Sequence, residues 1–204
     1  MIVVVASDKQ WNELTATRPH VEWQRAEHAE DFDQYKNADA FFCLLADAIS
    51  TDLGFLKKPV FINSVIATLS ELNLPPHVFR INGWAGFLQR PVWEIAGLAN
   101  EGADLILQSL QIKASFVKDE PGFISARVIA MIINEAYFAL EDEVSSKAEI
   151  DTAMKLGTNY PLGPFEWALQ IGVENVSALL QKLSSTDSRY KPSQLLLKEA
   201  AEKK

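Results

Sequence analysis

The side chains that carry most proton, nucleophilic and metal chemistry are scarce in this chain of 204 residues. Its histidines are His20, His28 and His77, and its one cysteine is Cys43. Cys43 lies in an apolar run, which indicates a buried thiol without a chemical role. No group of histidines, aspartates and glutamates has the spacing of metal ligands, so we predict no metal site.

The histidines are also poorly placed for a catalytic role. His77 precedes a predicted strand, and His20 has a similar position, so both should lie at the N-terminal edge of a sheet. Ligands of doubly wound sheets bind beyond the carboxyl ends of the strands. His28 follows a predicted strand, but Glu27 and Glu30 stand beside it, which favours a solvated acidic surface.

The first half alternates between short apolar runs and helical segments. We predict strands over residues 2–6, 21–25, 40–45, 59–62 and 78–81, with helices over 8–17, 31–37 and 66–72. The strand over 40–45 is apolar throughout, which is typical of burial on both faces. This alternation predicts a parallel sheet with right-handed crossovers. Residues 1–118 are therefore predicted to form an α/β domain.

The second half is predicted to be almost wholly helical. Helices are expected over residues 100–111, 123–140, 146–157, 176–183 and 194–204, with one last strand over 112–117. The helix over 123–140 is apolar on nearly every side, which predicts burial between domains or subunits. Ser146 and Glu149 form a capping-box pattern, and Gly157 is expected to end that helix. Residues 119–204 should thus form an all-α domain.

The turn after the first strand has no phosphate-binding pattern. A nucleotide-binding α/β domain needs glycines there, so that backbone N–H groups at the start of a helix can approach a diphosphate. This chain has Ala6-Ser7-Asp8 followed by Lys9-Gln10. The carboxylate of Asp8 would repel a diphosphate, whereas Asp is well suited to cap a helix. The turn therefore predicts a capped helix start with Asp8 as the cap.

The overall charge excludes some classes of partner. The formal net charge is -8 and the sequence pI is near 4.9, so the surface should repel nucleic acid and anionic membranes. No apolar run reaches the roughly 18 residues of a membrane span. Residues 1–8 are too short and not basic enough for a secretion signal. We expect a soluble cytoplasmic protein with neither a nucleic-acid nor a membrane partner.

Three segments of the second half keep a distinctive order and spacing. They are Asp119-Glu120-Pro121-Gly122-Phe123, Asn134-Glu135-Ala136 and Tyr160-Pro161-Leu162-Gly163-Pro164-Phe165-Glu166. Together they resemble the C-terminal helical domain of 3-hydroxyacyl-CoA dehydrogenases. The resemblance implies a Rossmann-like domain, shortened here, before a helical dimerisation domain of the 6-phosphogluconate dehydrogenase C-terminal type. It also implies NAD as cofactor, an acyl-CoA ligand and a homodimer.

The first half resembles the same family more weakly. Phe61-Ile62-Asn63-Ser64 is similar to the strand and loop at the cofactor crevice, and Arg80-Ile81-Asn82-Gly83-Trp84 to the strand that leads to the active site. If a cofactor crevice is present, the resemblance places Ser7, Asn63 and Ser64 in it.

The resemblance also locates the positions of the family's catalytic residues. The histidine falls on Ala85, the glutamate on Gly97, the asparagine on Ala126, and the hydroxyl contact on Val65 or Ile66. None of these side chains can exchange a proton or donate a hydrogen bond. We therefore expect no catalytic residue there and no bound cofactor, in a degenerate homologue that acts by binding or assembly. The alternative is an active NAD-dependent 3-hydroxyacyl-CoA (3-hydroxybutyryl-CoA) dehydrogenase of fatty-acid metabolism with an altered site.

Arg90 and Glu94 lie near the same segment. They could contact an anionic ligand, although a surface ion pair is the simpler interpretation. Trp84, Phe87 and Trp93 add aromatic surface that we assign to core or interface packing.

Overall fold

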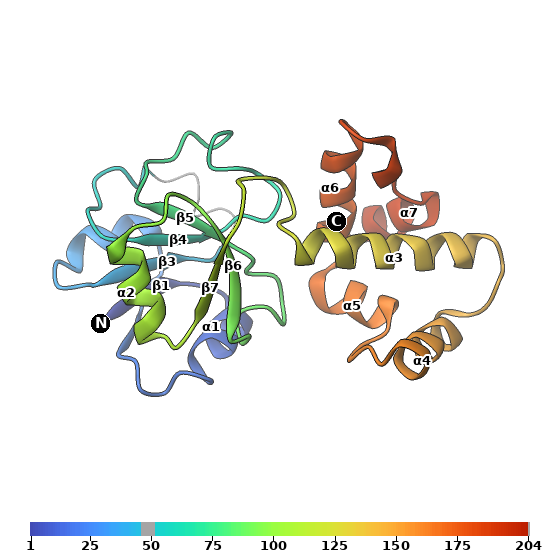
Figure 1. Ribbon diagram of the computed structural model, residues 1–204, viewed down its shortest axis with the longest axis horizontal. Coiled ribbons are helices and arrows are strands. Elements are labelled where there is room, and N and C mark those ends of the chain that lie inside the picture. The colour runs from blue at the N-terminus through green and yellow to red at the C-terminus, as the bar shows by residue number, and fades with distance from the viewer. Residues whose placement is uncertain (46–51, 204) are drawn as a thin grey trace. The chain divides into compact units, whose positions relative to one another are not determined.

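The computed structural model describes residues 1–45 and 52–203. The chain divides into two compact units, Met1–Phe123 and Ile124–Lys204 (Figure 1). The first is an α/β unit and the second consists of helices. A sheet dominated by parallel strands, followed by a helical unit, confirms the predicted fold class.

The described residues of the first unit form one sheet of seven strands in the order β2-β1-β3-β4-β5-β6-β7. The strands are β1 (Ile2–Val5), β2 (Trp23–Arg25), β3 (Ala40–Cys43), β4 (Val60–Asn63), β5 (Val78–Ile81), β6 (Val92–Ala96) and β7 (Lys113–Phe116). All neighbouring pairs are parallel except β5 and β6. Strand β1 lies between β2 and β3, so the direction in which the chain adds strands to the sheet reverses after β2. Doubly wound sheets bind their ligands at such a switch point.

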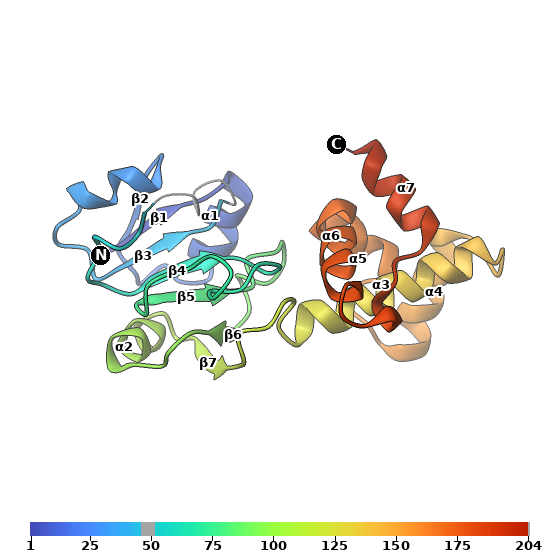
Figure 2. The ribbon, with the colours of Figure 1, turned by 90° about the horizontal axis from the view of Figure 1, so that it is seen from above.

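Helices and loops cover both faces of this sheet (Figure 2). On one face α1 (Asp8–Thr15) and α2 (Glu101–Ser109) pack over a row of aromatic rings. In that row the centroids of Phe42 and Phe61 are 4.8 Å apart, and those of Phe61 and Phe79 are 5.3 Å apart. The other face carries η1 (Ala29–Gln34) and apolar loop residues. Strands β1 and β3 are apolar because both of their faces are buried, which confirms the expectation for β3.

Three local predictions for the first unit are wrong. Residues 66–72 form turns instead of a helix, because the backbone N–H groups of Leu69 and Ser70 donate to the carboxylate of Asp119. Strand β6 was not expected, since it alternates exposed and buried side chains and has no continuous apolar run. The N-cap of α1 is Ser7, and Asp8 is the first helical residue.

The helical unit contains α3 (Ser125–Glu141), α4 (Lys147–Thr158), α5 (Pro164–Ile171), α6 (Val173–Ser184), η3 (Ser188–Tyr190) and α7 (Gln194–Glu202). Helix α3 packs against α5, α6 and α7. It buries one stripe that includes Ile129, Ile133 and Tyr137, while Val128 on another side is 52% exposed. Burial of the remaining apolar surface of this helix between domains or subunits stays a prediction. No helix in the described part of the chain is long and apolar enough to span a membrane.

The start of α4 was predicted correctly from the sequence, whereas its end was not. The capping box of Ser146 and Glu149 is confirmed. Gly157 lies inside the helix, so its predicted role as the cap is wrong. The chain leaves the helix at Asn159, which takes the left-handed conformation with φ 56°. Asn tolerates that conformation better than most residues, so it can replace glycine at a helix end.

Buried polar side chains hold the loops of the helical unit. The amide of Asn134 donates to the carbonyl oxygen of Lys191 at 3.0 Å and accepts from the N–H of Ser193 at 2.9 Å. The carboxylate of Asp151 accepts from the N–H of Phe165 at 2.8 Å. A Cβ at Gly163 would lie 2.2 Å from that carboxylate, so the turn before α5 requires glycine. Asn134 and Gly163, which belong to the quoted motifs, therefore have structural roles.

Candidate functional site

The candidate site is the edge of the first unit's sheet where β1, β3, β4 and β5 end. Ser7 follows β1, Asn63 ends β4 and Ser64 comes directly after it, so the structure brings all three predicted crevice residues to this edge. Parallel strands end together there, and any ligand of this fold type is expected to bind beyond them.

The turn after β1 is closed on itself. The hydroxyl of Ser7 accepts from the N–H of Gln10 at 3.3 Å, and the Gln10 side-chain oxygen accepts from the N–H of Ser7 at 3.2 Å. Asp8 forms an ion pair with Arg25 at 2.7 Å. The backbone donors of Ser7 and Gln10 are therefore already bonded to side chains, and a carboxylate lies beside them.

Side chains also join the ends of three strands. The side-chain amide of Gln10 donates to the carbonyl oxygen of Leu44 at 2.9 Å, and that of Asn63 donates to the same oxygen at 3.2 Å. Asn63 accepts in turn from the N–H of Gly83 at 3.0 Å. A Cβ at Gly83 would lie 2.6 Å from Cγ of Asn63, so the packing is close. We call Gln10, Leu44, Asn63 and Gly83 the edge network.

These residues do not fit the dinucleotide that the resemblance implies. A diphosphate needs free N–H groups on a glycine turn. Here no glycine is present, the N–H groups of Ser7 and Gln10 are occupied, and Asp8 adds a negative charge. The edge network also joins the ends of β3 and β4 to the loop after β5.

Ser64 is likewise engaged. It is buried, and its hydroxyl donates to the carbonyl oxygen of Ala67 at 2.8 Å. Its own carbonyl oxygen accepts from Nε of Arg80 at 2.8 Å. Ser64 therefore holds the loop after β4 in place.

The positions to which the resemblance assigns the family's catalytic residues lie in varied surroundings. Ala85 is half-buried in the loop after β5, Val65 is buried and Ile66 is half-buried. Ala126 is buried within the helical unit. Gly97 has φ +148°, and a Cβ there would lie 2.6 Å from the ring of Phe79, so a larger side chain is excluded.

Arg80 is a functional candidate that sequence reasoning did not single out. Its side chain is wholly buried, forms an ion pair with Asp119, and donates to the carbonyl oxygen of Val65 at 3.2 Å. It also lies over the ring of Phe123 at 4.7 Å. Burial lowers its pKa, and the hydrogen bond and charge of Asp119 oppose that shift. The available signal was a lone charge inside an apolar strand, since such a charge needs a partner.

The other titratable candidates have structural contacts. Nε2 of His20 and Nε2 of His77 lie 3.0 Å and 3.1 Å from backbone carbonyl oxygens, near the N-terminal ends of the strands. His28 precedes η1 as its N-cap residue. Arg90 donates to the carbonyl oxygen of Gly86 at 3.2 Å, and burial lowers its pKa while Glu94 opposes the shift.

The expected burial of aromatic and sulfur side chains is confirmed. Trp84, Phe87 and Trp93 are each 5% or 6% exposed, and Cys43 is fully buried. Burial, with a smaller effect of Glu30, raises the pKa of the Cys43 thiol to about 12. The thiol is therefore protonated at neutral pH and unreactive.

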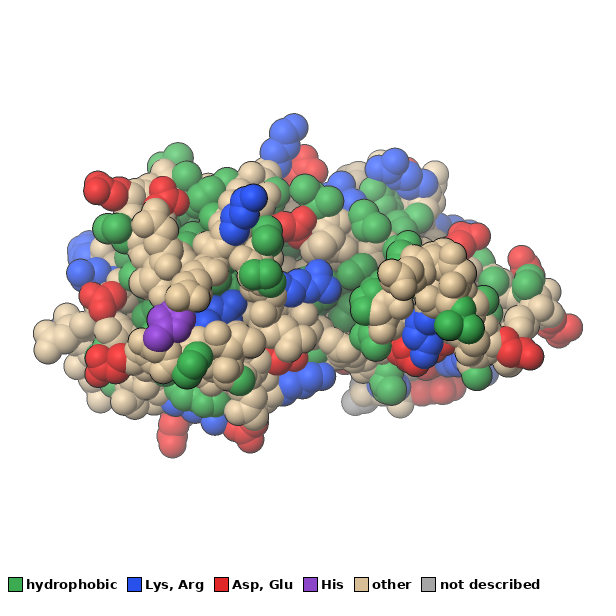
Figure 3. Space-filling view, turned by 60° about the horizontal axis from the view of Figure 1, so that its bottom comes forward, with side chains coloured by type: hydrophobic (Ala, Val, Ile, Leu, Met, Phe, Trp, Pro, Cys, Tyr) green, Lys and Arg blue, Asp and Glu red, His purple; other side chains and the backbone are tan. Residues whose placement is uncertain are grey.

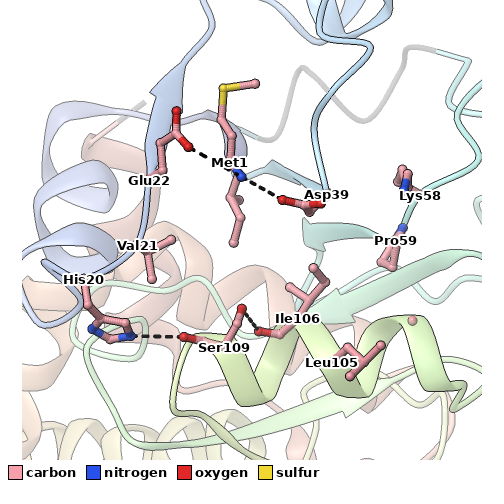
Figure 4. Close-up of a pocket in the computed structure, with 12 residues that line it drawn as sticks. Met1, His20, Val21, Glu22, Asp39, Lys58, Pro59, Leu105, Ile106 and Ser109 are labelled. Atoms are coloured by element: carbon pink, nitrogen blue, oxygen red, sulfur yellow. Dashed lines mark hydrogen bonds and ion pairs between the residues drawn. The ribbon is translucent and has the colours of Figure 1, made fainter.

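A separate cavity of about 570 Å³ lies at the opposite edge, where β1 begins (Figure 4). The amino group of Met1 points between Asp39 and Glu22, at 2.7 Å and 4.0 Å. Val21, Leu105 and other apolar side chains form much of its lining. No group of three or more possible metal ligands occurs among the described residues.

A smaller cavity of about 270 Å³ lies in the helical unit. Nζ of Lys147 pairs with Glu199 at 2.6 Å and lies 5.2 Å from the ring centroid of Phe165. The hydroxyl of Tyr137 donates to the same carboxylate at 2.9 Å, and burial raises the pKa of this tyrosine. The charges of Lys147 and Glu199 compensate each other, which indicates a structural cluster.

Residues 122–204 match the family model of the 3-hydroxyacyl-CoA dehydrogenase C-terminal domain. The helical part of the chain is therefore similar to the C-terminal domain of 3-hydroxyacyl-CoA dehydrogenases. The resemblance stated from the sequence motifs is thereby confirmed.

Two curated relatives with similar sequences are also named as dehydrogenases of acyl-CoA substrates. A 3-hydroxyadipyl-CoA dehydrogenase of Escherichia coli is 45% identical over 86 residues, which are 41% of this chain and 18% of the relative. A 3-hydroxybutyryl-CoA dehydrogenase of Bradyrhizobium diazoefficiens is 35% identical over 111 residues, which are 51% of this chain and 38% of the relative. The matched part is thus well under two thirds of either relative.

The structure of (S)-3-hydroxybutyryl-CoA dehydrogenase from Ralstonia eutropha aligns with 99% of this chain and 93% of its own, with a TM-score of 0.76. The identity is 18%, so this similarity establishes the fold alone. Both units thus follow the architecture of the dehydrogenases, a Rossmann-like sheet and a helical domain.

Proposed function

We propose that this chain is a binding or assembly member of the 3-hydroxyacyl-CoA dehydrogenase family that does not itself transfer a hydride. The observation that carries the proposal is the edge network, in which Gln10 and Asn63 bond to Leu44 and Gly83 where a dinucleotide would lie. Hydride transfer needs a bound nicotinamide and a proton acceptor beside the substrate hydroxyl. The chain has Ala85 at the position of the family's histidine.

A second candidate is an active NAD-dependent 3-hydroxyacyl-CoA dehydrogenase with an altered site. The comparisons favour this candidate over the first, because the family and the reported relatives carry dehydrogenase names. It requires the edge network to open and residues outside the family positions to move the proton.

The two candidates differ in a simple assay. Purified chain is mixed with NADH and acetoacetyl-CoA, and loss of nicotinamide absorbance is followed. The first candidate predicts no loss above that of a mock preparation from cells without the gene. Turnover that rises in proportion to the concentration of the chain would refute it and establish the second. A Gln10→Ala preparation serves as a matched control for contaminating enzymes, since their activity would not change with the variant.

We further propose that the helical unit mediates assembly, as a homodimer or with an active family member. Its surface carries exposed apolar side chains (Figure 3). These are Ile124, Val128, Val144, Leu156 and Leu169, which are 52% to 83% exposed. Isolated exposed apolar residues are common, and the first unit carries as many, so the support for a contact surface here is this exposure taken together with the homodimer that the resemblance implies.

The oligomeric state tests this assembly proposal. Val128→Asp places a charge on the exposed side of α3 and should shift a dimer to monomer in analytical ultracentrifugation. Leu105→Asp is the control, because Leu105 is similarly exposed on α2 of the first unit. Ile133 is unsuitable for this test, since its side chain is fully buried and a charge there would unfold the unit. A Val128→Asp protein with unchanged mass would contradict this contact.

A further inference from the structure

A hollow of about 200 Å³ lies near the N-terminal ends of β3 and β4. Its lining is largely aromatic and apolar, with Phe32 and Phe41 packed at 4.7 Å between ring centroids. Tyr35 is half-buried, and Phe55 is 43% exposed. Exposed aromatic surface beside a concave hollow offers a planar ligand a stacking surface.

Three lysines rim this hollow. They are Lys36, Lys57 and Lys58, all exposed, and the lining contains one carboxylate, that of Asp33. Within the part of the chain that the structure describes, no side-chain hydrogen bond or ion pair engages these three lysines. The hollow is thus locally positive on a chain of net charge -8. Three exposed ammonium groups around one hollow attract a phosphate.

This hollow is distinct from the edge network. Lys58 lies two residues before β4 and Lys36 four residues before β3, whereas Asn63 ends β4 at the other edge of the sheet. Lys58 also lines the cavity of about 570 Å³ that contains Met1, so a ligand held at Lys58 has space on either side. A site here is independent of the crevice and of the function proposed for it.

We propose that this hollow binds a nucleoside phosphate, with the base against Phe55 and Tyr35 and the phosphate at Lys57, Lys58 and Lys36. The aromatic surface accounts for the ring, and the three exposed lysines account for the charge. Neither feature alone selects this ligand, since a free phosphate needs no ring and an uncharged ring needs no lysines.

Binding to the full chain is measured by calorimetry with three probes: AMP, adenosine and inorganic phosphate. AMP should bind about tenfold more tightly than adenosine or inorganic phosphate, because base stacking and charge pairing act together in AMP alone. In Lys57→Gln/Lys58→Gln, AMP affinity should fall about tenfold, and in Phe55→Ser by a similar factor. Lys113→Gln/Lys118→Gln is the control, with the same change of charge at other exposed lysines, and should keep wild-type affinity.

Both substituted segments are exposed, so these variants should fold, which circular dichroism verifies. No AMP binding by the wild type would overturn the proposal. So would equal affinity for AMP and inorganic phosphate, or an equal loss in the Lys113→Gln/Lys118→Gln control. Since the nicotinamide assay does not depend on this hollow, failure here leaves the function proposed for the crevice unaffected.

Discussion

The two units use the same kind of polar contact to opposite effect. In the helical unit, Asn134 and Asp151 hold loops that a helical domain must fix. At the sheet edge, Gln10 and Asn63 hold the ends of strands at the place where doubly wound sheets bind their ligands. In the helical unit these hydrogen bonds fix loops and do nothing else. At the sheet edge they occupy the N–H donors that a ligand of this fold type would need.

The largest expected effect of a single substitution is at Arg80, which ties the sheet to the turn at Asp119. Arg80→Ala leaves a partly buried carboxylate and two carbonyl oxygens without their donor, so the first unit should lose about 3 kcal/mol of unfolding free energy. Urea denaturation followed by tryptophan fluorescence measures this. Arg25→Ala removes an exposed ion pair and should cost under about 1 kcal/mol. Equal losses would contradict the role assigned to Arg80.

The helical unit should respond next most strongly, at Asn134. Asn134→Ala removes both hydrogen bonds to the segment before α7 and leaves buried backbone groups unpaired, at a cost of about 2 kcal/mol. Thermal unfolding of the chain reports the loss. The adjacent Glu135 is exposed, so Glu135→Ala should change stability by less than about 0.5 kcal/mol. If both variants unfold alike, the motif has no structural role.

Loosening the edge network should have a smaller effect on stability. Asn63→Ala removes one donor and one acceptor from a half-buried position, at a cost of about 1 kcal/mol. Hydrogen exchange at the N–H of Gly83 should accelerate, because that group loses its acceptor. Protection unchanged from the wild type would show that Asn63 does not hold the edge closed.

The smallest expected effect is a pH dependence at the start of α4. Hydrogen bonds from Ser145 and Ser146 lower the pKa of Glu149 from 4.5 to about 2. A lowered pKa in the folded state stabilises the fold above the unfolded value and is lost as pH falls from about 4.5 to about 2. Ser146→Ala should therefore flatten the acid-induced loss of stability in that range. Denaturation at several pH values, compared with Ser70→Ala as an exposed control, measures it.

Local features of the fold could be predicted from the sequence. Strand β5 was predicted at its observed bounds because Val78, Phe79 and Ile81 form an apolar run, and Ser146 identified the start of α4. The end of α4 could not be placed, because both Gly157 and Asn159 can stop a helix and the packing decides between them.

Contacts between distant segments could not be predicted in this way. Arg80 and Asp119 lie 39 residues apart, and Gln10 and Leu44 lie 34 apart. A hydrogen bond of that separation leaves no periodic pattern in the sequence. The absence of glycine after β1 indicated a poor phosphate turn, but the side chains that occupy the edge became apparent only with the strands in place.

The most direct test of the closed edge is a crystal structure of the chain soaked in NAD. Our account predicts that Gln10 and Asn63 keep their bonds to Leu44 and that no dinucleotide lies at the carboxyl ends of β1 and β4. A diphosphate bound to the N–H groups of Ser7 and Gln10, with the edge network opened around it, would contradict the account.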